Sequence, residues 1–111
     1  MLMEKRFGLI GGGSWATALA KLLSNNSDDV KWWFRHEESV EHLKKFKHND
    51  KYLQSVEFDL GRVHPSSDLE WVMKNSDVIV VAVPSAFVFK TFDGFKCEGI
   101  EKKVLFSAIK G

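Results

Sequence analysis

The run Val78–Val83 is the feature of the sequence that most constrains its fold. It consists of six consecutive apolar residues, most of them β-branched, between Asp77 and Pro84. Because no polar residue alternates with the apolar ones, a strand formed by this run has no face suited to water, and both faces must be covered. Strands of this kind are typical of parallel sheets with helices on both sides. The run therefore predicts a parallel α/β sheet rather than an antiparallel one.

The N-terminal part of the sequence has the pattern of a strand, a tight turn, a helix and a second strand. Arg6–Ile10 is a short, mostly apolar run that ends in three glycines. Ser14–Ser24 is rich in Ala and Leu on one helical face, with Ser14 as the expected N-cap. Val30–Phe34 is β-prone and aromatic, which predicts the second strand. The whole unit closes within about 30 residues, as a βαβ unit does.

The rest of the chain continues the alternation of helices and strands. Residues Asn49–Gly61 show no clean period, and we expect a loop there. Ser67 and Glu70 have the spacing of a capping box, which predicts a short helix after Ser67. The remaining expected elements are helices at Glu37–Lys47 and Ala86–Phe92 and a last strand at Val104–Ala108.

The turn Gly11–Ala16 fits the pattern G-x-G-x-x-G/A between a strand and a helix. Gly11 allows the tight turn, and Gly13 lacks a Cβ, so a pyrophosphate can approach the unpaired N–H groups at the helix N-terminus. Ala16 is small enough for close packing of helix on strand. The pattern predicts a Rossmann-type doubly wound parallel sheet that binds a dinucleotide. The alternative is a glycine-rich turn in an α/β protein that binds no nucleotide.

The residue that ends the second strand bears on the choice between NAD and NADP. An acidic residue at this point binds the ribose 2′-hydroxyl and repels a 2′-phosphate. Here the residue is Arg35, whose guanidinium can pair with phosphate or stack on adenine, so we expect NADP to be accepted. Glu37 keeps NAD possible. The alternative for Arg35 is a solvated side chain on a loop.

Other candidate residues follow strands at the same edge of the sheet, where open α/β sheets bind ligands. Phe34 and Phe87 could line a cofactor groove, or they could be core residues. Lys110 follows the last expected strand and could place an ammonium beside the nicotinamide, although by position alone it could be a solvated lysine. The candidate cofactor-binding residues are Gly11, Gly13, Ser14, Trp15, Ala16, Phe34, Arg35, His36, Pro84, Phe87 and Lys110, and Lys110 is also the candidate substrate-binding residue.

Charge and cysteine content exclude several classes of protein. Sixteen basic and fifteen acidic residues give a net charge of +1 without a basic stripe, so we expect no nucleic-acid partner. The single cysteine, Cys97, excludes an internal disulfide and fits a reducing compartment. The charged segment Met1–Phe7 resembles neither a signal peptide nor a membrane anchor, so we expect a cytoplasmic protein.

The residues that could support metal binding or nucleophilic catalysis are poorly placed for it. The histidines show neither i, i+4 spacing nor a cysteine pair beside them, so we expect no metal site and interpret them as surface residues. Ser85 and Cys97 have no evident base nearby in sequence. The histidines concerned are His36, His42, His48 and His64.

Five segments together resemble the N-terminal domain of NAD(P)-dependent glycerol-3-phosphate dehydrogenases: GGGSWATALAKLL, KWWFRHEE, HNDKYL, SDVIVVAVPSAF and FSAIKG. The resemblance implies that Ser14, Trp15 and Arg35 contact the dinucleotide and that Lys110 touches both cofactor and glycerol 3-phosphate. It also implies reversible hydride transfer between sn-glycerol 3-phosphate and dihydroxyacetone phosphate, which supplies glycerophospholipid synthesis. The chain departs from the family at Ala16, where glycine is common, and at Gln54, where proline is common.

The resemblance also implies what residues 1–111 lack. The family's general-base lysine and phosphate-binding arginine belong to a helical C-terminal domain that would follow Gly111. We therefore expect one truncated domain that binds cofactor without turnover, and a possible homodimer only in the full-length form. Two alternatives remain: the NADP-binding domain of a 2-dehydropantoate or hydroxy-acid reductase, and a non-catalytic nucleotide-sensing or interaction domain.

Overall fold

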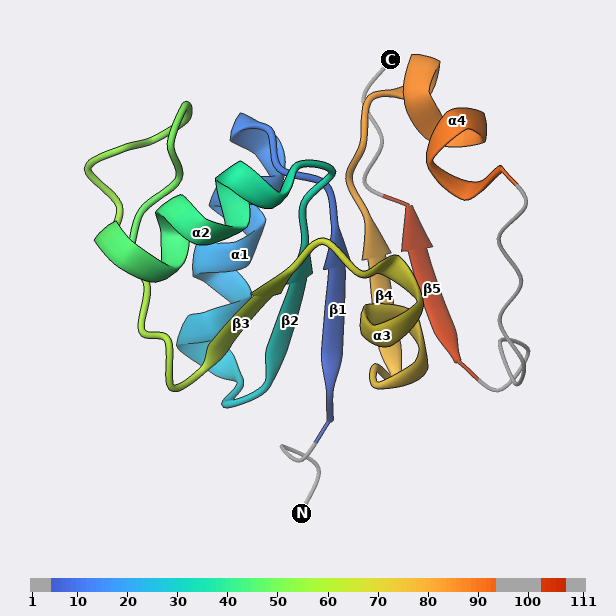
Figure 1. Cartoon of the computed structure of the whole chain (residues 1–111). Helices are drawn as coiled ribbons and strands as arrows, with labels where there is room; N and C mark the ends of the chain where they lie inside the picture. The colour runs from blue at the N-terminus through green and yellow to red at the C-terminus, as the bar shows by residue number, and fades with distance from the viewer. Residues whose placement is uncertain (1–4, 94–102, 108–111) are drawn as a thin grey trace.

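The computed structural model describes residues 5–93 and 103–107, and within them the chain forms one parallel sheet (Figure 1). The strand order is β3-β2-β1-β4-β5, with Phe7 of β1 paired to Val30 on one side and Val78 on the other. This confirms the predicted Rossmann-type doubly wound sheet, whose order reverses between β1 and β4. The strands are β1 (Phe7–Ile10), β2 (Val30–Trp33), β3 (Val63–Ser66), β4 (Val78–Val81) and β5 (Val104–Ser107).

Helices lie on both faces of this sheet, as the unbroken apolar run predicted. Residues of α1 and α2 join the buried cluster on one face, and residues of α3 and α4 pack with the cluster on the other. None of the described helices is long and apolar enough to cross a bilayer. The helices are α1 (Ser14–Asn26), α2 (Glu37–Phe46), α3 (Leu69–Lys74), the 3-10 turn η2 (Ser85–Phe87) and α4 (Val88–Phe92).

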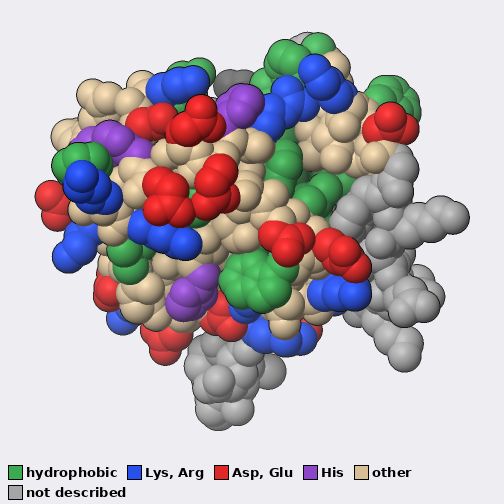
Figure 2. Space-filling model, in the orientation of Figure 1, with side chains coloured by type: hydrophobic (Ala, Val, Ile, Leu, Met, Phe, Trp, Pro, Cys, Tyr) green, Lys and Arg blue, Asp and Glu red, His purple; other side chains and the backbone are tan. Residues whose placement is uncertain are grey.

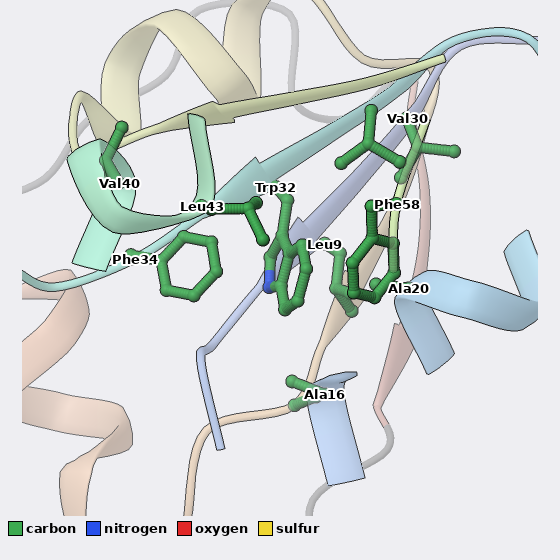
Figure 3. Packing of buried hydrophobic residues seen from close by; sticks show 11 residues of the cluster. Leu9, Ala16, Ala20, Val30, Trp32, Phe34, Val40, Leu43 and Phe58 are labelled. Atoms are coloured by element: carbon green, nitrogen blue, oxygen red, sulfur yellow. The ribbon is translucent and has the colours of Figure 1, made fainter. Parts of the chain in front are cut away.

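Trp32 is the centre of the larger cluster (Figure 3). Its ring is fully buried, with centroids 4.4 Å from Phe34 and 5.1 Å from Phe58. Ala16 and Ala20 bring α1 close to the sheet because their side chains are small. The indole N–H of Trp32 donates to the carbonyl of Gly11 at 2.6 Å. The core on this face therefore also holds the end of β1 in place.

β3 is an element that the sequence analysis missed. Its middle contains Pro65, and proline is confined to edge strands because it cannot donate to a ladder. The N–H groups of Val30 and Phe34 donate to the carbonyls of Arg62 and Ser66, so alternate residues of β3 face β2 and the nitrogen of Pro65 faces the open edge. The loop predicted at Asn49–Gly61 is confirmed, since no helix or strand forms there.

Two predicted helix caps are wrong. Ser14 is the first residue inside α1, and the N-cap is Gly13, which makes no side-chain capping bond. Asp68 rather than Ser67 caps α3, because its carboxylate accepts from the N–H of Trp71 at 3.1 Å. The Ser67 hydroxyl instead donates to a carboxylate oxygen of Glu37. Both errors shift a helix start by one residue and leave the layers unchanged.

Candidate functional site

Two adjoining cavities of about 220 Å³ and 230 Å³ form a groove over the glycine-rich turn, at the carboxyl ends of the strands. Figure 2 shows a hollow with hydrophobic side chains between the surface over α4 and the body of the molecule. The two cavities share Gly13, Tyr52, Val83 and Pro84. The groove therefore crosses the point where the strand order reverses, which is where open α/β sheets bind ligands.

Two glycines of the turn are required by the chain itself. Gly11 has φ +132°, and a Cβ there would lie 2.8 Å from the carbonyl oxygen of Ala82. A Cβ on Gly12 would lie 2.6 Å from the ring of Phe34. Any side chain at either position would collide with the neighbouring strand end or with the core.

Gly13 differs from both, because nothing in the described chain requires it to be glycine. Its φ of −82° suits any residue, and a Cβ built on it meets no atom within 4 Å. The open space belongs to the groove, since Gly13 lines both of its cavities. Gly13 is also the N-cap of α1, and the first N–H groups of a helix have no partners within the helix and favour an anion. The bare backbone at this point fits a phosphate group that approaches closely.

The aromatic side of the groove is formed by the ends of β2 and β4. Arg35 follows β2 as an exposed residue, and its guanidinium carbon lies 5.4 Å from the centroid of the Phe87 ring. Phe34 is nearly fully buried in the core and still lines the groove, so the two roles considered for it coincide. A planar aromatic ligand could stack on these groups.

Arg35, Lys51 and Asp50 line the groove, so cations outnumber carboxylates there and the charge favours an anion. Neither Arg35 nor Lys51 takes part in an ion pair within residues 5–93 and 103–107. Glu37, which kept NAD possible at the sequence level, does not line the groove. Its carboxylate accepts from the Ser67 hydroxyl, and this bond lowers the pKa of Glu37 below its usual value. A 2′-phosphate beside Arg35 therefore meets no opposing carboxylate from this residue.

All the candidate cofactor-binding residues in the described part of the chain line one of the two cavities. Lys110 lies outside the described residues, as does Cys97. The interpretation of all four histidines as surface residues is wrong in part: His36 is exposed, and the other three are partly buried. Sequence reasoning gave no role to several groove residues, although HNDKYL was one of the segments that carried the resemblance. These residues are Trp33, Ser39, Asp50, Lys51, Tyr52, Val83 and Thr91.

The comparisons with known proteins agree with this geometry. The family model described as the N-terminus of NAD-dependent glycerol-3-phosphate dehydrogenase matches residues 6–111. The chain belongs to this family. The match favours it over the 2-dehydropantoate and hydroxy-acid reductases that share the glycine pattern.

Individual members of the family are similar along much or all of the chain. Glycerol-3-phosphate dehydrogenase [NAD(P)+] of Pseudomonas paraeruginosa is 33% identical over 111 residues, which cover 100% of this chain and 32% of that protein. Its counterpart in Agathobacter rectalis is 42% identical over 87 residues, 78% of this chain and 25% of that protein. The crystal structure of glycerol-3-phosphate dehydrogenase from Coxiella burnetii superposes with a TM-score of 0.81 at 25% identity, covering 98% of this chain and 33% of that one. The chain thus spans about a third of the relatives' length.

Proposed function

We propose that this chain binds NAD or NADP in the groove, as the cofactor-binding part of an enzyme that interconverts sn-glycerol 3-phosphate and dihydroxyacetone phosphate. The observation that carries the proposal is the open space around Gly13. A glycine that no neighbouring atom requires, at the N-terminus of a helix and on the wall of a groove, is explained by a phosphate that takes the place of a side chain. The names of the relatives supply the substrates of the proposal.

Each wall of the groove has a role in this proposal. The N–H groups at the start of α1, including that of Ser14, bind the pyrophosphate, and Trp15 and Ala16 continue the groove along the helix. Phe34 and Phe87 pack against the adenine, and Arg35 with His36 takes the 2′-phosphate of NADP. Pro84 borders the part of the groove that the two cavities share. The bound dinucleotide supplies the hydride chemistry, and these residues hold it in place.

Oxidation of an alcohol also needs a base for the hydroxyl proton. We propose that Lys110 orients glycerol 3-phosphate beside the cofactor and that the base lies in the two thirds of the relatives' length that this chain does not span. The chain is therefore expected to bind cofactor without sustained turnover. A cytoplasmic location and assembly of the complete enzyme as a homodimer belong to the same proposal.

Titration of the 111-residue chain with NADH and NADPH, followed by calorimetry, tests the binding. Absence of heat with both ligands would show that the proposed function is wrong. Spectrophotometry with dihydroxyacetone phosphate and each reduced cofactor tests whether residues 1–111 catalyse the reaction or only bind the cofactor. We expect no steady oxidation of cofactor; sustained oxidation that disappears in Lys110→Ala would instead place the chemistry within residues 1–111.

A further inference from the structure

Asn49 is a buried polar residue in the segment HNDKYL, and neither the motif nor the resemblance gave it a role. Only 1% of it is exposed, and its carboxamide uses both of its donors and both of its acceptor positions. The Nδ2 group donates to the carbonyl of Gly12 at 3.0 Å and to the hydroxyl of Thr17 at 2.9 Å. The Oδ1 atom accepts from the N–H groups of Lys51 at 2.8 Å and Tyr52 at 3.2 Å.

The bond to Gly12 fixes the orientation of a peptide plane in the glycine-rich turn. Because the peptide between Gly12 and Gly13 is trans, its C=O and N–H groups point in opposite directions. The carbonyl of Gly12 is held toward Asn49, so the N–H of Gly13 is held away from it. A glycine pair without such a bond could rotate this plane freely.

The bond to Thr17 extends the same constraint to the next peptide. The Thr17 hydroxyl donates to the carbonyl of Gly13 at 2.7 Å, and the Thr17 N–H donates to it at 2.9 Å. The N–H of Ser14, on the opposite side of that peptide, is thereby fixed in the direction of the helix N-terminus. Asn49 supports this arrangement because the Thr17 hydroxyl accepts from its amide.

The other half of the carboxamide acts on a second segment that lines the groove. By accepting from two consecutive N–H groups, Oδ1 folds the chain after Asn49 into a tight turn. Lys51 and Tyr52 line the same cavity as the glycines. One buried side chain therefore ties two segments of the groove lining together.

We propose that Asn49 is a positioning residue for the pyrophosphate of the dinucleotide: it orients the N–H groups of Gly13 and Ser14 and holds Lys51 at the same groove. The inference rests on the proposed dinucleotide-binding function. The group that Asn49 would help to bind is the diphosphate of a nucleotide, so ADP is a sufficient probe. The hydrogen bonds of Asn49 go to none of the residues that the proposed function assigns to adenine, so adenosine, which lacks phosphate, is the discriminating second probe.

The test compares Asn49→Ala with Asn75→Ala. Asn75 serves as the control because its Nδ2 also donates to a backbone carbonyl, that of Trp71 at 2.8 Å. It lies at the amino ends of the strands, away from the groove. Asn49→Ala is expected to lower the affinity for ADP about tenfold, the effect of losing the orientation of one or two hydrogen bonds to a charged group. Its affinity for adenosine should stay within about twofold of the unmodified chain. Asn75→Ala should change neither affinity.

Nuclear magnetic resonance of ¹⁵N-labelled chain measures both affinities and reports on the site itself. In the unmodified chain, ADP should shift the amide signals of Gly13 and Ser14, and in Asn49→Ala these shifts should shrink. A role of Asn49 in stability alone would leave the ratio of ADP to adenosine affinity unchanged, and that result would overturn the inference. If the unmodified chain binds neither ADP nor NADH, the proposed function itself is wrong.

Thr17→Val and Thr17→Ser decide the question if Asn49→Ala does not fold. Valine has the shape of threonine but no hydroxyl, so it removes one partner of Asn49, whereas serine keeps the hydroxyl. Thr17→Val is expected to lower the ratio of ADP to adenosine affinity about threefold, and Thr17→Ser to restore it. Equal ratios in the two variants would overturn the inference.

Discussion

Charged residues at the amino ends of the strands are arranged differently from those at the carboxyl ends. At the amino ends of the strands, charges pair with each other: Arg6 lies 2.9 Å from Asp77, and Lys31 lies 2.7 Å from Asp29. Arg62, just before β3, has Asp28 and Asp59 within 3.8 Å. These pairs join the starts of strands and the loops before them. At this edge the charges contribute to the fold and leave little for a ligand.

At the carboxyl ends of the strands, the cations that line the groove have no ion-pair partner among the described residues. Arg35 lies against an aromatic ring, and Lys51 lines the same cavity as the glycine-rich turn. The bare N–H groups at the start of α1 add partial positive charge to the same place. The difference shows how a ligand site can be located in a nearly neutral protein. The net charge gives no information, but the strand ends at which charged side chains lack ion-pair partners among the described residues mark the site.

Gly13→Val is the substitution with the largest expected effect on the groove. The added isopropyl group fills the space proposed for the pyrophosphate, and we expect NADH affinity to fall by about 100-fold or more, equivalent to about 2.7 kcal/mol. The melting temperature should fall by no more than about 5 °C, because a Cβ at this position meets no protein atom within 4 Å and the main cost is that of valine in place of glycine at the N-cap of α1. Calorimetry and thermal unfolding measure the two effects.

Ala18→Val, on the exposed side of α1, is the control for a new valine outside the groove. It should leave NADH affinity unaltered. Equal affinities for Gly13→Val and the unmodified chain, with the fold intact, would mean that the pyrophosphate lies elsewhere.

Arg35→Asp tests the contribution of one cation at the groove by reversing its charge. It should shift the preference between the cofactors toward NADH by about 1–3 kcal/mol, since a charge-assisted bond to the 2′-phosphate is lost and repulsion replaces it. The measured quantity is the ratio of NADPH to NADH affinity. Arg62→Asp makes the same charge change at the amino edge and should leave this ratio unaltered; a shift of equal size in both variants would contradict a local role for Arg35.

Asp77→Asn tests the amino edge, with the smallest expected effect. The hydrogen bonds from Arg6 lower the pKa of Asp77 from 3.8 to about 2. Because the folded-state pKa is depressed, the stabilisation is complete above about pH 4 and is lost as the pH falls toward 2. The carboxylate is 44% exposed, so solvent screening limits the loss at pH 7 to about 0.5–1 kcal/mol.

Urea unfolding at pH 7, 4, 3 and 2.5 measures this effect. The unmodified chain should lose stability between pH 4 and 2.5 more steeply than Asp77→Asn, and dinucleotide affinity at pH 7 should be equal in both. Identical pH dependence in the two proteins would show that the Arg6–Asp77 pair adds nothing to stability.

Much of this architecture could be predicted because the signals are local. The apolar run Val78–Val83 and the spacing of the glycines each report on a few consecutive residues, and both gave the correct layers and turn. The edge strand β3 was not predicted because proline argues against a strand unless that strand is known to lie at the margin of the sheet. The cap of α1 was not predicted because it is Gly13, which makes no side-chain capping bond and so leaves no polar signal. The cap of α3 was not predicted because Ser67 and Asp68 are neighbouring polar residues that could both serve.

The groove could be predicted only in part, for a related reason. Its glycines and the strand-end Arg35 follow from the motif, whereas the bond from Asn49 to Gly12 joins residues that are 37 positions apart. No periodicity or spacing encodes such a contact. The resemblance drew attention to the segment around Asn49 without indicating what holds it in place.

The proline of β3 has a consequence for how this sheet can grow. A strand from another molecule that approached β3 would meet a missing hydrogen-bond donor at Pro65, in the middle of a strand of only four residues. Templated addition, the first step of many aggregation reactions, is therefore disfavoured on this side. β5 forms the opposite margin and contains no proline. Of the two margins among the described strands, the one formed by β3 therefore carries a proline that opposes pairing, and the one formed by β5 does not.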